Sequence, residues 1–411
     1  MRQALLILTA REPAIFSSRG ATEGQHQTLA HPTGAALLGW AAGGGRYDGF
    51  VDPFTIFHSG LVRFSDALPL TRSGCPAYPV PQILAEPKHR RGGVVQTGDG
   101  SRRLDPGAVT VGCDPGERTG DGRKVQREAL RRIFLTTAGE VLLPLTGSRL
   151  RTATNQGRAA DGQLFGYTHL DPGDSQRYAA TIEAEPDAMS DSDWLRLLHA
   201  FDGQRLRLGR AAGTAYGGDY LCTVQDGRAA AGLWPCGAIA GGATRVRIWA
   251  LSDLALLDED GTACFAPSAG RLGLPEGGRF SRADSAIGVR RYAPWNGHLR
   301  GRDLERQVIE AGSVFSFTYE QPLNAMIQRK TVIGQYQEAG LGRILLAPLL
   351  LDGTDGLRNP GSAPILADAS DRIADEAPVR KGPELPGDGK EPVLLWLNAM
   401  LQLDDSRRTA V

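Results

Sequence analysis

The chain has 411 residues, which is enough for about two or three domains of ordinary size. Hydrophobic residues make up 41% of it and charged residues 22%, a balance that excludes a disordered or fibrous protein. Its 53 glycines and 25 prolines predict many turns and argue against a helical bundle. We find neither an apolar run of membrane-spanning length nor a secretory signal pattern, so we expect a soluble, cytoplasmic protein without membrane contact.

The first expected elements are a strand over 4–9 and a helix that starts near 31–34 and runs to Ala41, before the glycines at 43–45. Residues 57–69 alternate in polarity and predict a strand. Residues from about 71 to 140 are rich in Pro, Gly and Arg, and they are too numerous for a passive connection. We therefore expect an insertion with its own role there.

Further along, a strand over 178–184 precedes a helix whose N-cap candidates are Ser190 to Asp193 and which extends to Phe201. A glycine-rich loop, 209–218, separates strands expected over 204–209 and 219–224. Other strands are expected over 245–250, 313–319 and 344–351. We read 352–391 as an acidic Pro/Gly linker, and 392–403 as an apolar helix that docks on its own chain.

This order of elements predicts a β-rich α+β fold with a duplicated β-α-β-β-α-β core. Residues 1–170 would form an N-terminal module that carries the insertion, and 171–351 a second module with the glycine-rich loops.

The charges are unevenly distributed, although the formal net charge is zero. Arginine outnumbers lysine by 41 to 5. Residues 88–158 carry 14 basic and 7 acidic side chains, whereas 352–411 carry 7 basic and 11 acidic ones. A basic segment offset by an acidic tail fits an anionic partner, but a GC-rich genome would also favour arginine.

No known catalytic or cofactor motif is present. The sequence lacks a P-loop, a dinucleotide-binding glycine motif, a GxSxG elbow and a cluster of metal ligands, so we expect no cofactor and no metal. The five cysteines are odd in number and widely spaced, which predicts neither a disulfide framework nor a zinc knuckle: Cys75, Cys113, Cys222, Cys236 and Cys264.

Several short segments, taken in chain order, carry a resemblance to a known family. The loop Gly340-Leu341-Gly342-Arg343 resembles the C-terminal glycine-rich loop of the RAMP superfamily of CRISPR-associated proteins, and residues 206–210 followed by Ala215-Tyr216-Gly217 are similar to another of its turns. Four more segments resemble a narrower group, the large RAMP subunit (the Cas-five group, Csx-ten) of type III-D effector complexes: 57–69, 157–167, 251–253 and 311–315.

The resemblance implies two ferredoxin-like, RRM-related modules in a non-catalytic subunit that grips the 5′ handle of the CRISPR guide RNA (crRNA) in antiviral defence. Its partners would be other RAMP backbone subunits and the large polymerase-like subunit. Single-stranded RNA is bound by guanidinium groups and backbone amides on phosphates and by aromatic rings on bases. The candidate RNA-binding residues are Arg210, Tyr216, Gly217, Gly340, Gly342, Arg343, Lys88, Arg90, Arg91, Arg149, Arg151 and Arg158.

Two alternatives remain open from the sequence. A metal-independent endoribonuclease that processes precursor CRISPR RNA would need a histidine that titrates near neutral pH, and His26 and His31 are the candidates. A structural adaptor without RNA contact would agree with the zero net charge. For single features a structural explanation competes with the functional one: each glycine loop is also explained as a turn, and Tyr216 as a ring that packs beside glycine.

Overall fold

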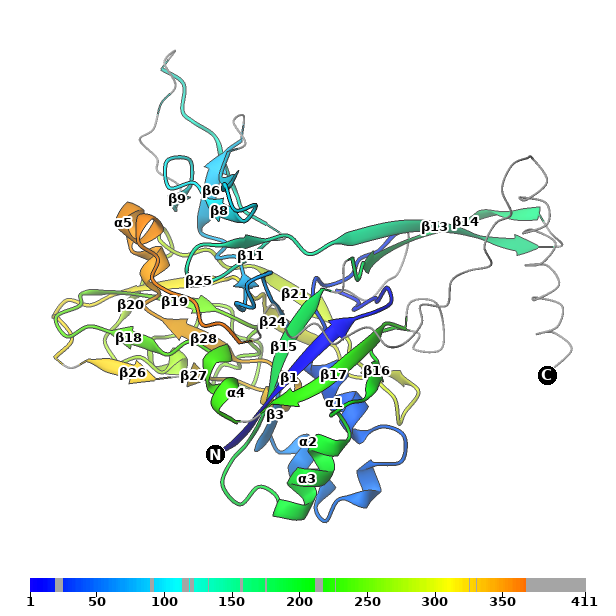
Figure 1. Cartoon of the computed structure of the whole chain (residues 1–411). Helices are drawn as coiled ribbons and strands as arrows, with labels where there is room; N and C mark the ends of the chain where they lie inside the picture. The colour runs from blue at the N-terminus through cyan, green and yellow to red at the C-terminus, as the bar shows by residue number, and fades with distance from the viewer. Residues whose placement is uncertain are drawn as a thin grey trace, which may run out of the picture. The chain divides into compact units, whose positions relative to one another are not determined.

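The computed structural model describes residues 1–18, 25–88, 92–112, 118, 122–131, 133–155, 158–173, 176–210, 217–225, 227–324, 326–329 and 331–366. For 25, 151–155, 158–165, 328, 329 and 331 it describes the backbone alone. These residues belong to one compact unit, Met1–Asp368 (Figure 1). The helix expected over 392–403, and most of the linker expected over 352–391, lie outside the described residues.

The first sheet is antiparallel and has the order β16-β17-β1-β15-β3, with β4 also paired to β15. Its central strand β1 (Arg2–Ala10) pairs along its length with β15 (Arg177–Ala184). The other strands are β16 (Arg205–Arg207), β17 (Asp219–Gln225), β3 (Val62–Phe64) and β4 (Leu68–Pro69).

One face of this sheet is covered by α1 (Gly34–Ala42), α2 (Pro53–His58) and α3 (Asp191–His199), whose buried side chains form one cluster with Leu6 and Leu8 of β1. Each helix begins where the sequence offers a cap, since Thr33, Asp52 and Ser190 accept hydrogen bonds from amides of the first turn. The predictions for α1 and α3 are confirmed. The strand expected over 57–69 is wrong at its start, because Asp52 and Pro53 start a helix, α2, that ends at His58.

The second sheet is also antiparallel, with the order β20-β25-β19-β28-β27. Its strands are β19 (Arg245–Ala250), β20 (Arg279–Phe280), β25 (Val314–Thr318), β27 (Thr331–Val332) and β28 (Arg343–Leu346). Trp249, Val314 and Leu345 share a buried cluster with Leu5 and Ile7 of β1, so one face of each sheet contributes to the same core. Helix α4 (Gly227–Leu233) adds Ala230 and Leu233 to that core.

Numbered along the chain, four strands of each sheet lie in the order 4-1-3-2: β17-β1-β15-β3 in the first and β28-β19-β25-β20 in the second. In the described part of 245–346 the second sheet has only the 3-10 turns η2 (Gly270–Leu272) and η3 (Gln337–Ala339) in place of helices. The structure therefore shows a β-rich α+β fold with this strand order twice, and it does not show two complete ferredoxin-like modules. Strands β15 and β17, which we expected in the second module, pair with β1, so the first sheet crosses residue 170.

The insertion over 71–140 folds into short strands whose apolar residues join the same central core, among them Leu84, Val109 and Leu130. Six of its strands form two small sheets: β5 (Tyr78–Pro79), β11 (Phe134–Leu135) and β12 (Val141–Leu142) in one, β6 (Leu84–Pro87), β9 (Thr110–Val111) and β10 (Arg127–Ala129) in the other. A separate pair joins β7 (Val94–Gln96) to β8 (Arg102–Leu104).

A long hairpin, β13 (Thr146–Asn155) and β14 (Arg158–Leu170), follows the insertion, and the short strand β2 (Gln25–His26) adds to it in parallel. The remaining pairs are β18 (Gly237–Ile239) with β26 (Ile327–Arg329), β21 (Val289–Tyr292) with β24 (Arg306–Ile309), and β22 (Trp295–Asn296) with β23 (Gly301–Arg302).

The start of the expected linker is instead ordered against the core. Residues 353–358 form α5 (Gly353–Arg358), preceded by the 3-10 turn η4 (Leu349–Leu351), and Leu357 is buried in the central cluster. Within the described residues, no helix is both long and apolar enough to span a membrane.

Candidate nucleic-acid interface

The first glycine-rich loop begins with Gly209 and Arg210, which are held against the segment before β2. The Arg210 amide donates to the Ile15 carbonyl over 2.8 Å. Gly209 has φ +105°, and a Cβ there would lie 2.9 Å from the same carbonyl oxygen, so this close approach needs glycine. At the other end of the loop, Gly217 is buried and forms a β-bridge with Ala14. Tyr216 lies outside the described residues, and Gly217 has a packing role.

This anchoring brings the exposed Arg210 side chain to His26, whose Nδ1 lies 2.9 Å from Arg210 Nη1. A guanidinium can only donate, so Nδ1 accepts and the ring proton of neutral His26 is on Nε2. The His26 ring stacks on Tyr167 with centroids 5.0 Å apart and planes 4° apart. β2 and β14 set this stack, because His26 and Tyr167 are register partners and Thr168 Oγ1 donates to the His26 carbonyl.

Two further arginines lie near this stack. Arg149 is the exposed cross-strand partner of Tyr167 on β13, and Arg302 of β23 is also exposed. The pKa of His26 is lowered first by burial and then by the positive charges of Arg210 and Arg302. We call this group the His26 surface: His26, Tyr167, Arg149, Arg210 and Arg302. It offers charge-assisted donors to phosphates beside stacked rings, which suits a single-stranded nucleic acid.

The second glycine-rich loop, 340–343, is buried and joins the two sheets. Gly340 has φ +95°, and a Cβ there would lie 2.9 Å from the Phe64 carbonyl oxygen of β3. Gly342 has φ +99°, and its Cβ would lie 2.1 Å from the Ile333 carbonyl oxygen. The Gly342 amide donates to the Asp253 carbonyl over 2.8 Å. These glycines therefore permit close backbone packing, and the loop does not present its amides to a phosphate.

Arg343 follows this loop and is 5% exposed. Its Nη2 lies 2.6 Å from Glu183 Oε2 on β15, and its guanidinium lies 4.8 Å from the centre of the Trp234 ring. Trp234 in turn donates from Nε1 to Thr181 Oγ1 over 2.9 Å. The expectation that Arg343 contacts RNA does not fit this arrangement, because its charge is already paired inside the protein; the residue links the second sheet to the first.

The other predicted residues fall into three groups. Lys88 is exposed at the end of β6, on the insertion. Arg151 lies on β13 and Arg158 begins β14, but their side chains are outside the description, as are Arg90 and Arg91 entirely. The structure thus places Arg210 beside His26 and Arg149 across from Tyr167, the partner of His26, and it leaves Lys88 apart, next to a different sheet.

The two candidate histidines have different surroundings. His31 is nearly buried, with Nε2 3.5 Å from Asp66 Oδ2 and its ring edge-on to Phe134. Its Nδ1 has no hydrogen-bond partner among the described residues. His26, by contrast, is half-buried on the His26 surface. Only His26 lies beside arginines and a tyrosine at a place that a large ligand can reach.

Sequence reasoning missed Tyr167 and Arg302 as site residues. Tyr167 ends the segment 157–167, which we used only as part of the resemblance. Arg302 belongs to a run of arginines over 290–302 that contains no acidic residue, a signal that was available in the sequence. Neither could be joined to His26 without knowledge of the pairing between β2 and β14.

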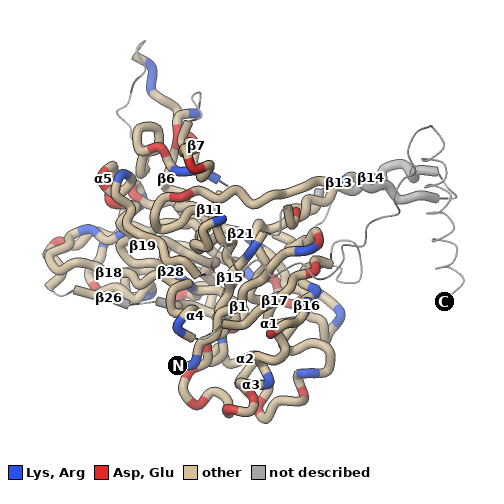
Figure 2. The backbone as a smooth tube through the Cα atoms, viewed as in Figure 1, with Lys and Arg blue, Asp and Glu red and all other residues tan. Residues whose placement is uncertain are grey.

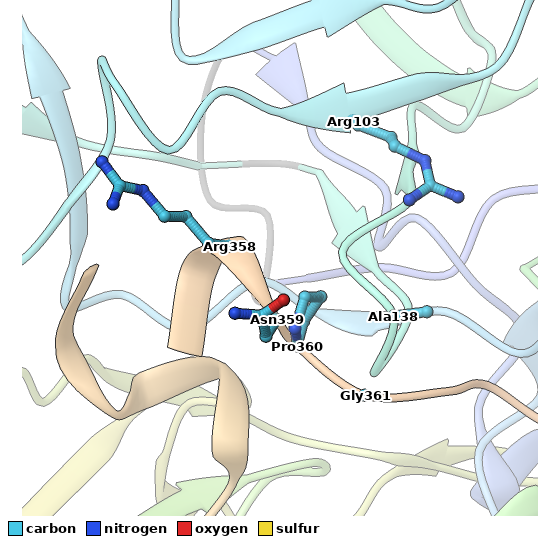
Figure 3. Close-up of a pocket in the computed structure, with 6 residues that line it drawn as sticks. All are labelled: Arg103, Ala138, Arg358, Asn359, Pro360 and Gly361. Carbon is cyan, nitrogen blue, oxygen red and sulfur yellow. The ribbon is translucent and has the colours of Figure 1, made fainter. Parts of the chain in front are cut away.

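A shallow pocket lies between β8 and the end of α5 and is lined by Arg103, Ala138, Arg358, Asn359, Pro360 and Gly361 (Figure 3). The guanidinium groups of Arg103 and Arg358 point away from each other, to opposite sides of the pocket. They do not converge on one anion. Along the described chain as a whole, basic and acidic residues are interspersed (Figure 2).

No protein-family profile and no curated protein matches the sequence. Among solved structures, the chain is similar in fold to a chain of the type III-B Cmr-beta complex bound to cognate target RNA and AMPPnP, with a TM-score of 0.40 and 13% identity over 76% of this chain and 86% of that one. It is also similar to Cmr4, with a TM-score of 0.25 and 12% identity over 55% of this chain and 99% of that one. For Cmr4 from Pyrococcus furiosus the TM-score is 0.24 and the identity 11%, with the same coverage.

Proposed function

We propose that this chain is a RAMP-type subunit of a type III CRISPR effector ribonucleoprotein and binds its guide RNA. The observation that carries the proposal is the His26 surface, where Arg149, Arg210 and Arg302 are exposed around a histidine–tyrosine stack. The sequence resemblance described above names the kind of assembly. In finer terms, we propose the large RAMP subunit of a type III-D complex, which holds the 5′ handle.

The chemistry of the site supports an RNA ligand held without a metal. Arginine presents a planar fork of donors that matches phosphate oxygens, and it stacks on aromatic faces as well. A single strand offers both phosphates and unstacked bases, and so it can use arginines and rings together. A handle region at one end of a guide would present such a strand.

The same proposal covers the architecture and the neighbours. We propose that the two sheets, each with the order 4-1-3-2, are two ferredoxin-like modules, the second with 3-10 turns where the first has helices. We propose that neighbouring RAMP subunits and a large polymerase-like subunit flank this chain.

The test is to purify the intact assembly through a tag on this chain and to sequence the RNA that accompanies it. We expect guides that share one 5′ end. The same purification with Arg210→Ala should yield less RNA per assembly, whereas Arg279→Ala should not, because Arg279 of β20 lies in an exposed ion pair with Glu320. An intact assembly free of RNA would contradict the proposal and favour an adaptor.

A second candidate function is favoured by one specific observation. His26, Tyr167 and Arg210 form a cluster in which His26 Nδ1 could accept a proton from a 2′-hydroxyl group once Arg210 turns from Nδ1 to the phosphate and steadies it there. A metal-independent endoribonuclease would need this arrangement. We expect repeat RNA to stay intact when it is incubated with the protein in chelator; cleavage that His26→Ala abolishes would make the endoribonuclease the better proposal.

A further inference from the structure

The hairpin over 294–303 presents an exposed tryptophan on a defined turn. Trp295 is 69% exposed and pairs across the hairpin with Arg302. Asn296 Oδ1 accepts from the amides of His298 and Leu299 over 3.0 and 3.1 Å, and the Asp303 amide closes the base by donating to the Pro294 carbonyl over 2.8 Å. A large aromatic ring held in solvent by a closed turn has no internal packing role.

The charge along the chain around Trp295 is mainly positive, and the carboxylate of Asp303 at the base of the hairpin lies 4.0 Å from Arg306. Residues 289–302 contain four arginines and no aspartate or glutamate. Arg290 is paired with Asp253 inside the protein. The other three are exposed and surround the tryptophan along the chain: Arg291, Arg300 and Arg302. An aromatic ring among exposed arginines is the combination that binds single-stranded nucleic acid.

Hydrogen bonds connect the strand before this hairpin to the segment that contains His26. The Arg290 guanidinium of β21, the strand that leads into the hairpin, donates to the Ser18 carbonyl over 3.0 Å. The Ser18 amide donates to the Gln27 carbonyl over 3.0 Å, and Gln27 follows His26 in the chain. At the other end of the hairpin, the positive charge of Arg302 contributes to the lowered pKa of His26. One strand of RNA can therefore meet both features.

We infer that Trp295 is a stacking platform for a base of the single-stranded RNA whose phosphates contact the His26 surface. This inference rests on the proposed function and deepens it, since it assigns a base contact to a residue outside the phosphate-binding group. Stacking on a ring tolerates any base, so Trp295 adds affinity and sets the path of the strand without reading its sequence.

The same hairpin fits a protein partner less well. Its exposed apolar residues, Trp295, Leu299 and Leu304, are separated in the sequence by arginine, glycine and aspartate. Arginine and tryptophan are common in protein–protein interfaces too, but residues 289–302 carry three exposed arginines and no carboxylate, and a single sign of charge complements the phosphates of a polyanion. RNA is thus the occupant that the charge favours.

The experiment uses the full chain and a short fluorescein-labelled single-stranded RNA of mixed sequence, with the matching duplex as the second probe. We expect Trp295→Ala to weaken single-strand binding about five- to a hundredfold, Trp295→Phe to weaken it much less, and duplex binding to change little. The control is Leu349→Ala, which removes an exposed apolar side chain on η4 and should leave both affinities unchanged. Quenching of intrinsic fluorescence by RNA should shrink in Trp295→Phe, since that part of the signal belongs to Trp295.

The outcomes separate this inference from the proposed function. If Trp295→Ala binds the single strand as tightly as the unaltered chain while Arg210→Ala binds weakly, the stacking platform is wrong and the RNA-binding function stands. If the unaltered chain and its assembly bind no RNA, the proposed function fails first. If Trp295→Ala keeps its RNA affinity but no longer joins the assembly, the hairpin binds a protein and the inference is overturned.

Discussion

Arg210 and Arg343 each lie beside glycines of positive φ at the edge of a strand, yet the protein uses them in opposite ways. Arg210 follows Gly209 and extends into solvent, where it donates to His26. Arg343 follows Gly342 and is buried, where it pairs with Glu183 and lies over Trp234. The sequences around them give similar signals. Their roles differ because of what the opposite segments of the fold supply.

The difference shows what a glycine beside an arginine can mean. At the first loop, glycine lets the chain approach Ile15 so that the next side chain points out of the sheet edge. At the second, the glycines let one backbone approach another so closely that no ligand can enter. A charged side chain in such a place must find a partner, because an unpaired buried guanidinium is very costly.

The largest effect should come from breaking the buried pair. Arg343→Ala leaves Glu183 uncompensated between the two sheets, so we expect the free energy of unfolding to fall by about 3–5 kcal/mol in urea denaturation of the full chain. If that variant does not fold, the double variant Glu183→Leu with Arg343→Met should still fold, because paired apolar replacements of similar volume are tolerated. An Arg343→Ala protein of unchanged stability would show that the pair is not structural.

The next effect is on RNA affinity. Arg210→Ala should weaken binding of single-stranded RNA by about 1.5–3 kcal/mol, the value of a hydrogen bond to a charged group. It should also lower the slope of log affinity against log salt by about one unit for the phosphate contact removed. A salt titration by fluorescence anisotropy measures both. Arg279→Ala removes the same charge from an exposed ion pair, and an equal loss there would mean that Arg210 acts only through net charge.

The third effect separates steric packing from backbone strain. Gly342→Ala and Gly242→Ala both place a Cβ on a residue of positive φ, at +99° and +85°. At Gly342 the Cβ would meet the Ile333 carbonyl oxygen at 2.1 Å, whereas at Gly242 nothing lies within 4 Å. We expect about 1–3 kcal/mol of strain in both variants and a further loss only at Gly342. Equal losses by thermal denaturation would contradict the close packing of the second loop.

The sequence could predict those features that depend on residues close together in the chain. The helix start near 31–34 and the cap candidates from Ser190 identified two helices, and the apolar runs identified β1, β15, β17, β19 and β25, because start signals and periodicity act within a few residues. Pairing was not local. Arg343 and Glu183 are far apart in the sequence and meet only when β28 and β15 face the same core, so the burial of Arg343 was invisible beforehand. The short strands of the insertion were missed for the same reason, since partners elsewhere in the chain define them.

The candidate site divides in the same way. Arg210 and Arg149 were identified from composition and resemblance, but their common location depends on β2 joining β14 and on Arg210 reaching back to the segment before β2. Tyr167 and Arg302 enter the site only through that tertiary arrangement. The residue type could therefore identify individual arginines as candidates for RNA binding, but only the fold shows which of them lie on the same surface.

The smallest expected effect is a change in the pKa of His26. The pKa of His26 lies below 6.5 because of burial, Arg210 and Arg302, in that order. Arg210→Ala removes one positive neighbour, so we expect the His26 pKa to rise while burial and Arg302 keep it below its ordinary value. NMR titration of histidine-labelled protein measures it, with Arg279→Ala as the control. An unchanged His26 pKa in Arg210→Ala would mean that the two side chains are not in contact in solution.

The same lowered pKa fixes the sign of the pH dependence. In the unfolded chain His26 takes up a proton near pH 6.5, before the folded protein does, so its contribution to stability is complete above that pH and is lost as the pH falls toward the folded pKa. RNA acts in the opposite direction, because a phosphate beside His26 stabilises the imidazolium and raises its pKa in the complex. Binding is then linked to proton uptake, and RNA affinity should increase as the pH falls from about 7.5 toward 6. His26→Gln should remove this increase while it leaves the arginine contacts in place. If the RNA affinity of the unaltered chain falls as the pH falls, no phosphate lies beside His26. Arg210, which contacts His26, would then lack the RNA contact by which we distinguish it from the buried Arg343.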